Sequence, residues 1–398
     1  TRRSAAAGTR TRIAANGAGD GRIGRREDRP RRRLARGLLP HLASVALTAT
    51  LLVVSVACRR ATRPEGAAVF PKAPVVLVSI DTLRSDRLPA YGYSKVKTPH
   101  LDRLAADSWR FASAWAPTPM TLPSHASMLT GALPPEHGVR GNSGFTLRGE
   151  GLPSLPRLLK AEGYATGAAV STFVLRHETG LGALFDAYED SVPTTPGVAT
   201  VRYQRPGEKT LAFAKEWVSA HAGGPFFYFF HVFEPHLPYE PAPEFLAEYG
   251  ATYEAEIATA DAVVGALLEH LRTLGLYEKA IVIVTSDHGE GLGDHGEEQH
   301  SLLLYREAIQ VPLFLKLPGS RGGGTVVDAP VQLSDLLPTV TGLLGLATPA
   351  GVSGRSLLAA AAPGSAPRTI YGETLYPRLH LGWADLRSVV DGRWHYVH

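Results

Sequence analysis

Val75-Val-Leu-Val-Ser-Ile80, followed directly by Asp81, is the clearest indication of the fold class. It is a short, continuous apolar run rich in β-branched residues, typical of a strand buried on both faces of a parallel sheet. Strand-like runs recur in four later segments: 165–170, 226–230, 280–286 and 311–317. Segments with helical character are 98–108, 154–163, 210–221, 254–274 and 333–344. This alternation predicts an α/β fold, with a large, mostly parallel sheet covered by helices on both faces.

The remaining segments are less regular. Residues 109–116 look extended, 189–208 look like a loop, and 372–382 look irregular. Near the end of the sequence, Asp391-Gly392 is a turn signal between two extended pieces, so we expect a hairpin there. The sequence stops inside this hairpin, and we expect the C-terminus to be incomplete.

Polar side chains follow three of the predicted strands. Asp81 ends the first strand, Asp287-His288 follows 280–286, and the segment from His231 to His236 continues from 226–230. Because ligands of open α/β sheets bind outside the carboxyl ends of the strands, we expect these residues to meet in one site. Adjacent Asp and His supply an oxygen and a nitrogen ligand, which favours a metal ion.

Thr121-Leu-Pro-Ser-His-Ala-Ser-Met-Leu-Thr-Gly131 is the stretch where we expect the chemistry. Threonine caps helix starts, proline is favoured in the first turn, and Gly131 closes the apolar run. Thr121 should therefore lie at a helix N-terminus, where N–H groups and the helix dipole favour an anion such as phosphate or sulfate. An ordinary capped helix is the alternative, and the strand-end residues favour the functional interpretation.

The charge is distributed unevenly along the chain. Residues 1–37 contain twelve Arg and three acidic residues, and 38–58 contain no charged residue. Residues 59–398 have 29 basic and 34 acidic residues, a net charge of −5, so the basic pI comes from the leader. A mildly acidic body argues against a nucleic-acid-binding face.

A positive region followed by an apolar one is the pattern of an export signal. Cys58, the single cysteine, ends the apolar segment and resembles the lipidation site of a bacterial lipoprotein; a plain signal or membrane anchor is the alternative. We expect a basic leader (1–37), a signal or anchor (38–58), a linker (59–72) and a catalytic domain (73–398). The body should be exported to the bacterial cell envelope and held at the membrane, without an internal disulfide.

Several blocks, in order along residues 75–395, resemble the sulfatase family of the alkaline phosphatase superfamily. They are Ser79-Ile-Asp81-Thr-Leu-Arg84, Thr98-Pro-His-Leu-Asp102-Arg103-Leu, Leu122-Pro-Ser-His-Ala-Ser-Met-Leu-Thr-Gly131, His137-Gly-Val139 and Ser286-Asp-His-Gly-Glu-x-Leu-Gly-Asp-His-Gly296. The resemblance implies a large α/β sandwich around a mixed sheet. It also implies hydrolysis of sulfate or phosphate esters with a metal and a covalent intermediate.

The resemblance also implies roles for single residues. Asp81, Asp287 and His288 match the family's metal ligands, and Thr121 falls at the nucleophile position, where it would also be a ligand. Asn142 falls where related phosphonate and sulfate ester hydrolases contact the substrate. Two histidines complete the set: His236 matches an active-site histidine, and His300 falls where many sulfatases have a substrate-binding Lys.

This sequence departs from the family pattern at four positions. Sulfatases oxidise a Cys or Ser nucleophile to formylglycine, but Thr121 is not accepted by that maturation, so we expect no formylglycine. His125 replaces an Arg and is expected to act in catalysis and substrate binding; Thr82 replaces a second acid or amide, and His300 replaces the Lys. A Thr nucleophile resembles the nucleotide pyrophosphatase/phosphodiesterase and phospho-headgroup transferase branches, so we expect phosphate to be preferred over sulfate.

The resulting hypothesis is a metal-dependent ester hydrolase. One divalent ion (Ca, Zn or Mn) would activate the Thr121 hydroxyl, since a threonine alone is a weak nucleophile. His236 or His300 would protonate the leaving group. A second ion could use some of Glu234, His236, His295 and His300. The expected partners are a small-molecule, glycan or lipid ester and the membrane, and the oligomeric state stays open.

Two alternatives remain open at this point. One is a transferase that moves a phospho-headgroup onto envelope glycan or lipid, which would need an acceptor alcohol. The other is a non-catalytic surface protein that binds an anionic glycan. The complete set of Asp81, Asp287 and His288 argues against the second, because a binding protein without a metal has little need of it.

Overall fold

The computed structural model of this protein describes residues 68–149, 151–194, 203–362 and 364–398. These described residues form one compact unit. The predicted basic leader, the apolar segment 38–58 with Cys58, and most of the linker lie outside the described residues, so the export signal and the lipid anchor stay predictions. Among the described helices, none is both long and apolar enough to cross a bilayer.

Eight strands form the central sheet. Their order across the sheet is β10 (Val326–Val327), β2 (Trp109–Phe111), β9 (Leu313–Lys316), β7 (Ile281–Thr285), β1 (Val75–Ile80), β6 (Phe226–Val232), β4 (Ala165–Ala169) and β5 (Ala187–Glu189). Strand β1 lies between β6 and β7 and is parallel to both, with Val75 opposite Phe227 and Ile281. Only the pairs that β9 makes with β7 and β2 are antiparallel. The sheet is therefore mixed and mostly parallel, which confirms the predicted fold class.

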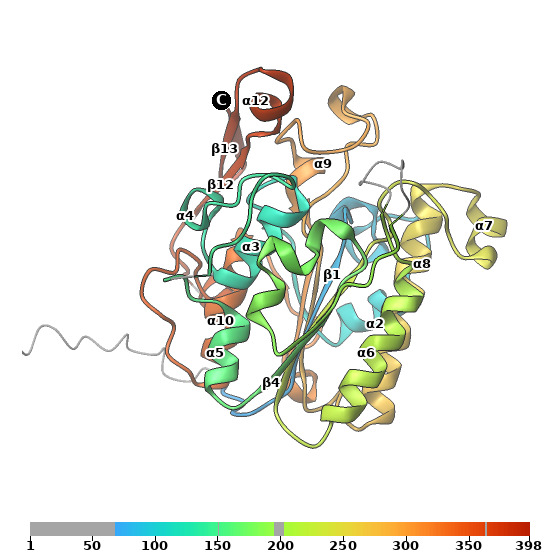
Figure 1. Ribbon diagram of the computed structural model, residues 1–398, viewed down its shortest axis with the longest axis vertical. Coiled ribbons are helices and arrows are strands. Elements are labelled where there is room, and N and C mark those ends of the chain that lie inside the picture. The colour runs from blue at the N-terminus through green and yellow to red at the C-terminus, as the bar shows by residue number, and fades with distance from the viewer. Residues whose placement is uncertain (1–67, 150, 195–202, 363) are drawn as a thin grey trace, which may run out of the picture. The chain divides into compact units, whose positions relative to one another are not determined.

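Helices cover both faces of this sheet (Figure 1). Leu77 and Ile283 pack on one side, against helices α3 (Thr121–Thr130), α5 (Leu155–Ala161) and α10 (Leu336–Leu344). Val78 and Val284, their neighbours along the strands, pack on the other side against α2 (Pro99–Ala106), α6 (Gly207–His221) and α8 (Tyr253–Thr273). Each such buried side chain stabilises the fold by roughly 1.5–3 kcal/mol. Packing on two faces therefore holds the central strands, and with them the residues at their ends, in fixed positions.

Two small sheets and several short elements complete the described chain. The first small sheet contains β11 (Val331–Gln332), β3 (Ala114–Trp115) and β8 (Gln310–Val311), and the second β12 (Thr369–Thr374), β13 (Leu386–Asp391) and β14 (Trp394–Val397). The short helices are α4 (Pro134–His137), α7 (Pro243–Tyr249), α9 (Arg306–Ile309), α11 (Leu357–Ala360) and α12 (Tyr376–Leu381). Single 3₁₀ turns occur at Ser85–Arg87, Pro89–Tyr91, Phe173–Leu175, His177–Thr179, Gly182–Leu184, Asp294–Gly296, Pro318–Ser320 and Leu333–Asp335.

The structure corrects two of the expected segments. Residues 372–382, expected to be irregular, contain the end of β12 and all of α12, which has Pro377 in its first turn and ends at Gly382. Six residues are too few for helical periodicity to show in the sequence. The extended stretch 109–116 is two strands in different sheets, β2 and β3. The predicted hairpin around Asp391-Gly392 is confirmed as β13–β14.

Helix α3 lies where the sequence predicts and ends at Gly131, but Thr121 does not cap it. Its N-cap, Met120, is extended, so Thr121 is the first helical residue. Gly131 ends the helix with a φ of 70°. A Cβ at Gly131 would lie 2.7 Å from Cγ1 of Val352, so both the backbone conformation and the packing require glycine. All ten residues of α3 are buried, which makes it a rigid support for Thr121.

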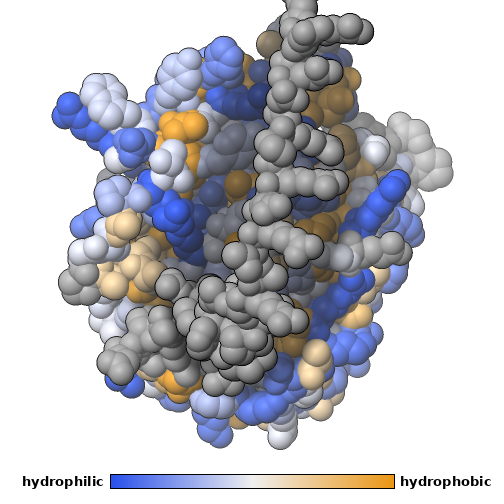
Figure 2. All heavy atoms as spheres, turned by 90° about the vertical axis from the view of Figure 1, so that its left-hand side faces the viewer, coloured by the Kyte–Doolittle hydropathy of each residue, from blue (hydrophilic) through white to orange (hydrophobic). Residues whose placement is uncertain are grey.

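Figure 2 shows one face of the molecule, where hydrophilic and intermediate residues surround separate hydrophobic patches outside the grey atoms. Many of the exposed large hydrophobic side chains belong to the C-terminal segment; these are Leu379, Leu381, Trp383, Val389, Trp394 and Tyr396. The C-terminal segment therefore leaves more apolar surface uncovered than the central sheet does.

Candidate active site

The ends of strands β1, β6 and β7 hold one another in place. The Asp81 N–H donates to the carbonyl of Val232 at 2.9 Å, and the Thr82 N–H donates to Oδ1 of Asp287 at 3.2 Å. The Ser286 Oγ accepts from the Leu83 N–H at 2.9 Å. These bonds join neighbouring strand ends, so Asp81 and Asp287 face each other on a fixed backbone.

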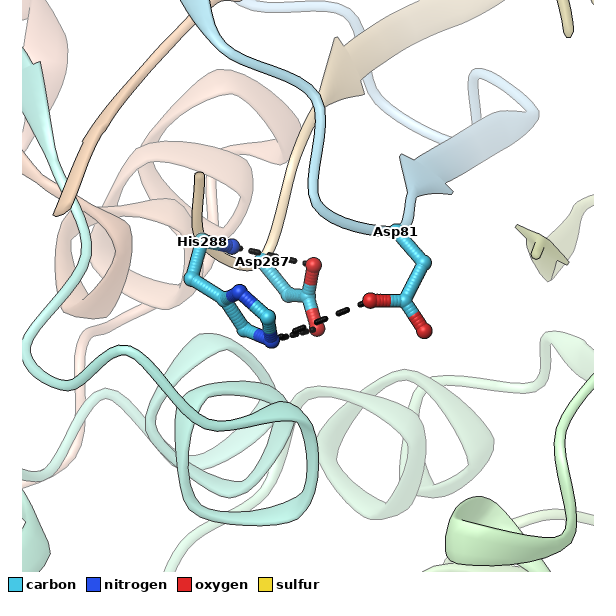
Figure 3. Close-up of side chains that lie close together, drawn as sticks. All are labelled: Asp81, Asp287 and His288. Atoms are coloured by element: carbon cyan, nitrogen blue, oxygen red, sulfur yellow. Dashed lines mark hydrogen bonds and ion pairs between the residues drawn. The ribbon is translucent and has the colours of Figure 1, made fainter. Parts of the chain in front are cut away.

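Asp81, Asp287 and His288 form a buried group of metal-ligand type, whose ligand atoms lie within 4.8 Å of one another. The Nε2 of His288 is 3.4 Å from Oδ2 of Asp287 and 3.7 Å from Oδ1 of Asp81 (Figure 3). The Nδ1 of His288 lies 2.9 Å from the Gly289 carbonyl. A Cβ at Gly289 would lie 1.9 Å from the Glu307 carbonyl oxygen, so only glycine lets these two backbone segments lie this close together.

This group fits a divalent cation. Oδ1 of Asp81 and Oδ2 of Asp287 are buried and have no hydrogen-bond partner, although each is close to His288. Leaving buried carboxylate oxygens unpaired is costly, and metal coordination is a common way to satisfy them. Two carboxylates and one imidazole are suitable ligands for several divalent ions. The predicted ligand set is therefore present as a spatial group.

The electrostatics of this group favour added positive charge. Burial raises the pKa of the Asp81 carboxyl. Burial alone would lower the pKa of His288, but the carboxylates of Asp287 and Asp81 outweigh it and raise that pKa. His231, which lies 3.5 Å from Oδ2 of Asp81, has its pKa lowered by burial to about 4 and is neutral near pH 7. Negative charge is thus concentrated where a cation would offset it.

Thr121 lies beside this group at the start of α3. Its Oγ1 is 3.3 Å from Nε2 of His288, and the residue is 3% exposed. The Leu122 N–H donates to Oδ1 of Asn142 at 2.9 Å, and Pro123 has no N–H. The helix N-terminus therefore has fewer N–H groups for an anion than its position alone predicts.

A cavity of about 430 Å³ opens over these residues. The predicted site residues that line it are Asp81, Thr121, Asn142, His236 and His300. The rings of His236 and His300 pack edge to face, with centroids 5.1 Å apart, and the His300 ring lies 4.4 Å from that of His288. Five of the eight predicted site residues thus share one cavity, and Asp287 and His288 lie buried beside it.

His125 is placed differently from the expectation. It is fully buried, its Nδ1 is 2.8 Å from the Thr121 carbonyl oxygen, and its Nε2 is 2.9 Å from the Ser79 Oγ. Its Nδ1 is also 3.7 Å from Oδ2 of Asp287. Both ring nitrogens contact protein atoms, so the geometry favours a role in positioning Thr121 and Asp287. A direct contact of His125 with substrate stays a prediction.

The four residues suggested for a second ion do not form one group, because His236 and His300 pack together while His295 and Glu234 have other partners. His295 is half-exposed, stacks on Tyr305 and lies 2.5 Å from Oε1 of Glu307. Oε1 of Glu234 accepts from the Gly207 N–H at 2.9 Å. Among the described residues, the single group of three or more metal-ligand side chains is Asp81, Asp287 and His288.

The structure adds residues that the sequence did not single out. Glu290 is fully buried, its Oε1 is 3.1 Å from the His300 Nδ1, and burial raises its pKa to about 7. Arg84 binds the carbonyls of Glu290 and Gly291 and so fixes the same loop. Tyr376 and His380 of α12 line the cavity. Glu290 and Arg84 lie inside the quoted motifs and could have been identified there, whereas α12 carried no signal.

Comparisons with known proteins agree with this geometry. The Sulfatase family profile matches residues 74–346, more than half of the chain. An ulvan-active sulfatase of Formosa agariphila is 27% identical over 72% of this chain and 64% of its own length. Human arylsulfatase A is 26% identical over 71% of this chain and 66% of its own length. The chain thus spans slightly less than two thirds of these relatives.

Solved structures show the same fold. A protein solved with its substrate D-glucosamine-2-N,6-O-disulfate superposes with a TM-score of 0.71 at 18% identity, covering 82% of this chain and 88% of its own. The phosphonate monoester hydrolase of Agrobacterium radiobacter superposes with a TM-score of 0.67 at 21% identity, covering 82% and 87%. With the family profile, the mixed sheet and the Asp81–Asp287–His288 group, the chain belongs to the sulfatase family of the alkaline phosphatase-like superfamily.

Proposed function

We propose that this protein is a metal-dependent ester hydrolase that uses Thr121 as a covalent nucleophile and prefers phosphate esters to sulfate esters. The observation that carries the proposal is the position of the Thr121 hydroxyl. It lies at the floor of the cavity, 3.3 Å from Nε2 of His288 and beside two unpaired carboxylate oxygens. A hydroxyl needs an activating group to attack an ester, and this floor supplies the ligands for one.

Asp81, Asp287 and His288 would hold the cation, which when bound would lower the pKa of a neighbouring hydroxyl and offset the charge of the reacting ester. The residues of the chain do the rest. The Thr121 Oγ gives its proton to solvent water and forms a bond to the phosphorus, while the bond from phosphorus to the leaving alcohol oxygen breaks and that oxygen takes a proton from a cavity histidine. Water then cleaves the threonine ester, which releases phosphate and restores the hydroxyl.

The leaving alcohol needs a proton, and two cavity histidines are placed to supply it. The Nδ1 of His236 lies 2.5 Å from the Leu237 carbonyl oxygen, and the Nδ1 of His300 contacts Glu290. In both rings Nδ1 faces the protein, so Nε2 is the nitrogen free to serve the substrate. We assign proton transfer to one of these two nitrogens, and separate His236→Gln and His300→Gln variants would distinguish them.

The preference for phosphate rests on the nucleophile. A threonine cannot be converted to formylglycine, and in this superfamily the resemblance links an unmodified threonine to phosphodiester chemistry. The relatives named as sulfatases favour the opposite choice, so substrate comparison is the direct test. Purified protein should be assayed with nitrophenyl phosphate, bis-nitrophenyl phosphate and nitrophenyl sulfate, each with and without chelator.

Phosphate turnover that the chelator stops is the expected result. Turnover of the sulfate ester alone would overturn the phosphate preference. If metal binds but no ester is cleaved, repeating the assay with an acceptor alcohol separates a transferase from a binding protein, and either outcome overturns hydrolysis.

We also propose that the protein acts in the bacterial cell envelope, anchored at the membrane through residues 38–58 or a lipid on Cys58. The basic leader followed by an uncharged apolar segment supports this location. Fractionation of cells expressing the full chain, compared with a Cys58→Ala variant, is the test. Release of the variant into the soluble envelope fraction supports lipid anchoring, and recovery of the wild type with cytoplasmic proteins contradicts export.

A further inference from the structure

A second cavity of about 410 Å³ continues from the catalytic one. The two cavities share Asn142, Ser143 and Val174 in their walls, so together they form one trough. Thr121 lines only the first cavity and Arg176 only the second. A substrate whose ester reacts at Thr121 can therefore extend past Asn142 toward Arg176.

Arg176 is held in place at its end of the trough. Its guanidinium lies 4.2 Å from the centre of the Phe173 ring, and its Nη1 donates to the Phe173 carbonyl at 3.2 Å. Stacking on an aromatic ring and a backbone bond restrict the side chain without neutralising its charge. Among the described residues that line the two cavities, Arg176 is the only Arg or Lys.

One acidic side chain, Glu178, competes with a ligand anion for the guanidinium of Arg176. Oε2 of Glu178 lies 3.7 Å from Nε of Arg176, and the two side chains are 73% and 36% exposed. An ion pair this long and this exposed contributes little, because water screens it. A ligand anion that meets the planar guanidinium with two hydrogen bonds would displace it.

We propose that Arg176 binds a second anionic group of the substrate, remote from the ester that reacts. The substrate class is then an ester whose organic part carries a further carboxylate, sulfate or phosphate. This inference rests on the proposed function in one respect, that the reacting ester sits at Thr121. Ser143 and Thr146 also line the second cavity, and their hydroxyl groups would bind polar atoms between the two anions.

Binding of non-hydrolysable probes tests the inference without turnover. The metal-loaded protein is titrated calorimetrically with methylphosphonate and with alkane bisphosphonates of increasing chain length. We expect at least one chain length to bind about tenfold more tightly than methylphosphonate, since a second charged contact is worth about one such factor. An equal affinity for all chain lengths, or no binding by any probe, overturns the inference.

Four variants locate the second contact. Arg176→Ala should remove the chain-length gain and leave methylphosphonate affinity unchanged, while Arg176→Lys keeps part of the gain. Glu178→Gln should raise bisphosphonate affinity about threefold by removing the competing charge. Arg157→Ala is the matched control, because Arg157 also donates one bond to a backbone carbonyl, that of Gly149, but lines neither cavity. Thermal unfolding checks that each variant is folded.

If bisphosphonates still bind more tightly than methylphosphonate in Arg176→Ala, Arg176 does not bind the second anion. A bisphosphonate affinity that falls in Glu178→Gln contradicts the assignment as well. The failures of the two proposals are distinguishable. Ester turnover without a chain-length gain keeps the proposed function and rejects the second site. A gain that depends on Arg176, without turnover of any ester, keeps the site and rejects hydrolysis.

Discussion

The floor and the rim of the candidate active site are built from different parts of the chain. The floor consists of Asp81, Thr121, Asp287 and His288, which are at most 3% exposed and follow strands β1 and β7 or begin helix α3. The rim includes Val174, Leu237 and Pro238 from connecting segments, and Tyr376 and His380 from the short helix α12. The ends of regular elements thus carry the nucleophile and the metal-ligand group, while less regular segments surround the entrance.

This difference separates residues that carry out the reaction from residues that select the substrate. The strands that carry the floor are packed on both faces, so the floor residues are held in fixed positions. This suits groups that must meet a reacting atom within a fraction of an ångström. A rim on loops can vary without disturbing the core, and loops commonly determine which substrate is accepted. Changes in the floor should therefore affect every substrate equally, and changes in the rim should affect substrates selectively.

The largest effect is expected from Thr121→Ala. Removing the nucleophile should lower kcat by about a thousandfold or more for every ester, because the remaining groups cannot form the covalent intermediate. Metal affinity, measured by calorimetry, should remain within a few fold. Thr121→Ser is the matched control and should keep measurable turnover. Activity in the alanine variant close to that of the wild type would reject the nucleophile assignment.

Asp287→Asn tests the floor through the metal. We expect divalent-ion affinity to fall by about a hundredfold, since a buried charged ligand becomes a neutral amide. Calorimetric titration of chelator-treated protein measures this. Asp294→Asn is the control, because Asp294 lies in the same loop, is about half-exposed and binds Arg84 instead. Equal affinities in the two variants would mean that Asp287 is not a ligand.

The floor was more predictable than the rim for a physical reason. Buried strands have a recognisable composition, and the residues that follow parallel strands lie together at the carboxyl ends of those strands. Asp81 and Asp287 could therefore be placed close to each other without a structure. His125 shows the limit of this reasoning. It lies four residues after Thr121, one helical turn farther from the cavity, and its ring bonds back to the Thr121 carbonyl. Sequence spacing placed His125 near Thr121 but could not show that its side chain is buried in the core and does not line the cavity.

The rim could not be predicted because its geometry depends on contacts between distant segments. Arg140 illustrates this, since its guanidinium forms two 2.7 Å bonds with Glu373 of β12, far along the chain. Strand β12 leads into α12, which brings Tyr376 to the cavity. Neither Arg140 nor Glu373 belongs to a motif that points to such a pairing.

A smaller effect concerns the helix that supports the floor. His137 lies next to α3, its Nε2 is 2.9 Å from the Ser127 Oγ, and its Nδ1 accepts from the Val139 N–H at 3.1 Å. Burial lowers its pKa to about 4. Between pH 4 and the ordinary histidine pKa of about 6.5, the unfolded state binds more protons, so stability falls as the pH falls through this window.

His137→Gln should therefore reduce the loss of unfolding free energy between pH 7 and pH 4.5 by about 2 kcal/mol. Urea unfolding of both proteins at the two pH values measures the difference. The other buried histidines contribute equally to both proteins and cancel. An unchanged pH dependence would show that folding does not lower the pKa of His137.

The smallest effect is expected at the rim, from Tyr376→Ala. Tyr376 lines the cavity and packs on His380, with ring centroids 4.3 Å apart, so its ring offers an apolar wall to the organic part of the substrate. Loss of one aromatic contact should raise KM for aryl esters about fivefold and leave kcat nearly unchanged. Trp383→Ala is the control, because Trp383 is a more exposed aromatic residue of the same segment that lines no described part of the cavity. If Tyr376→Ala lowers kcat for all esters equally, the rim acts on the chemistry as the floor does, and the division between them is wrong.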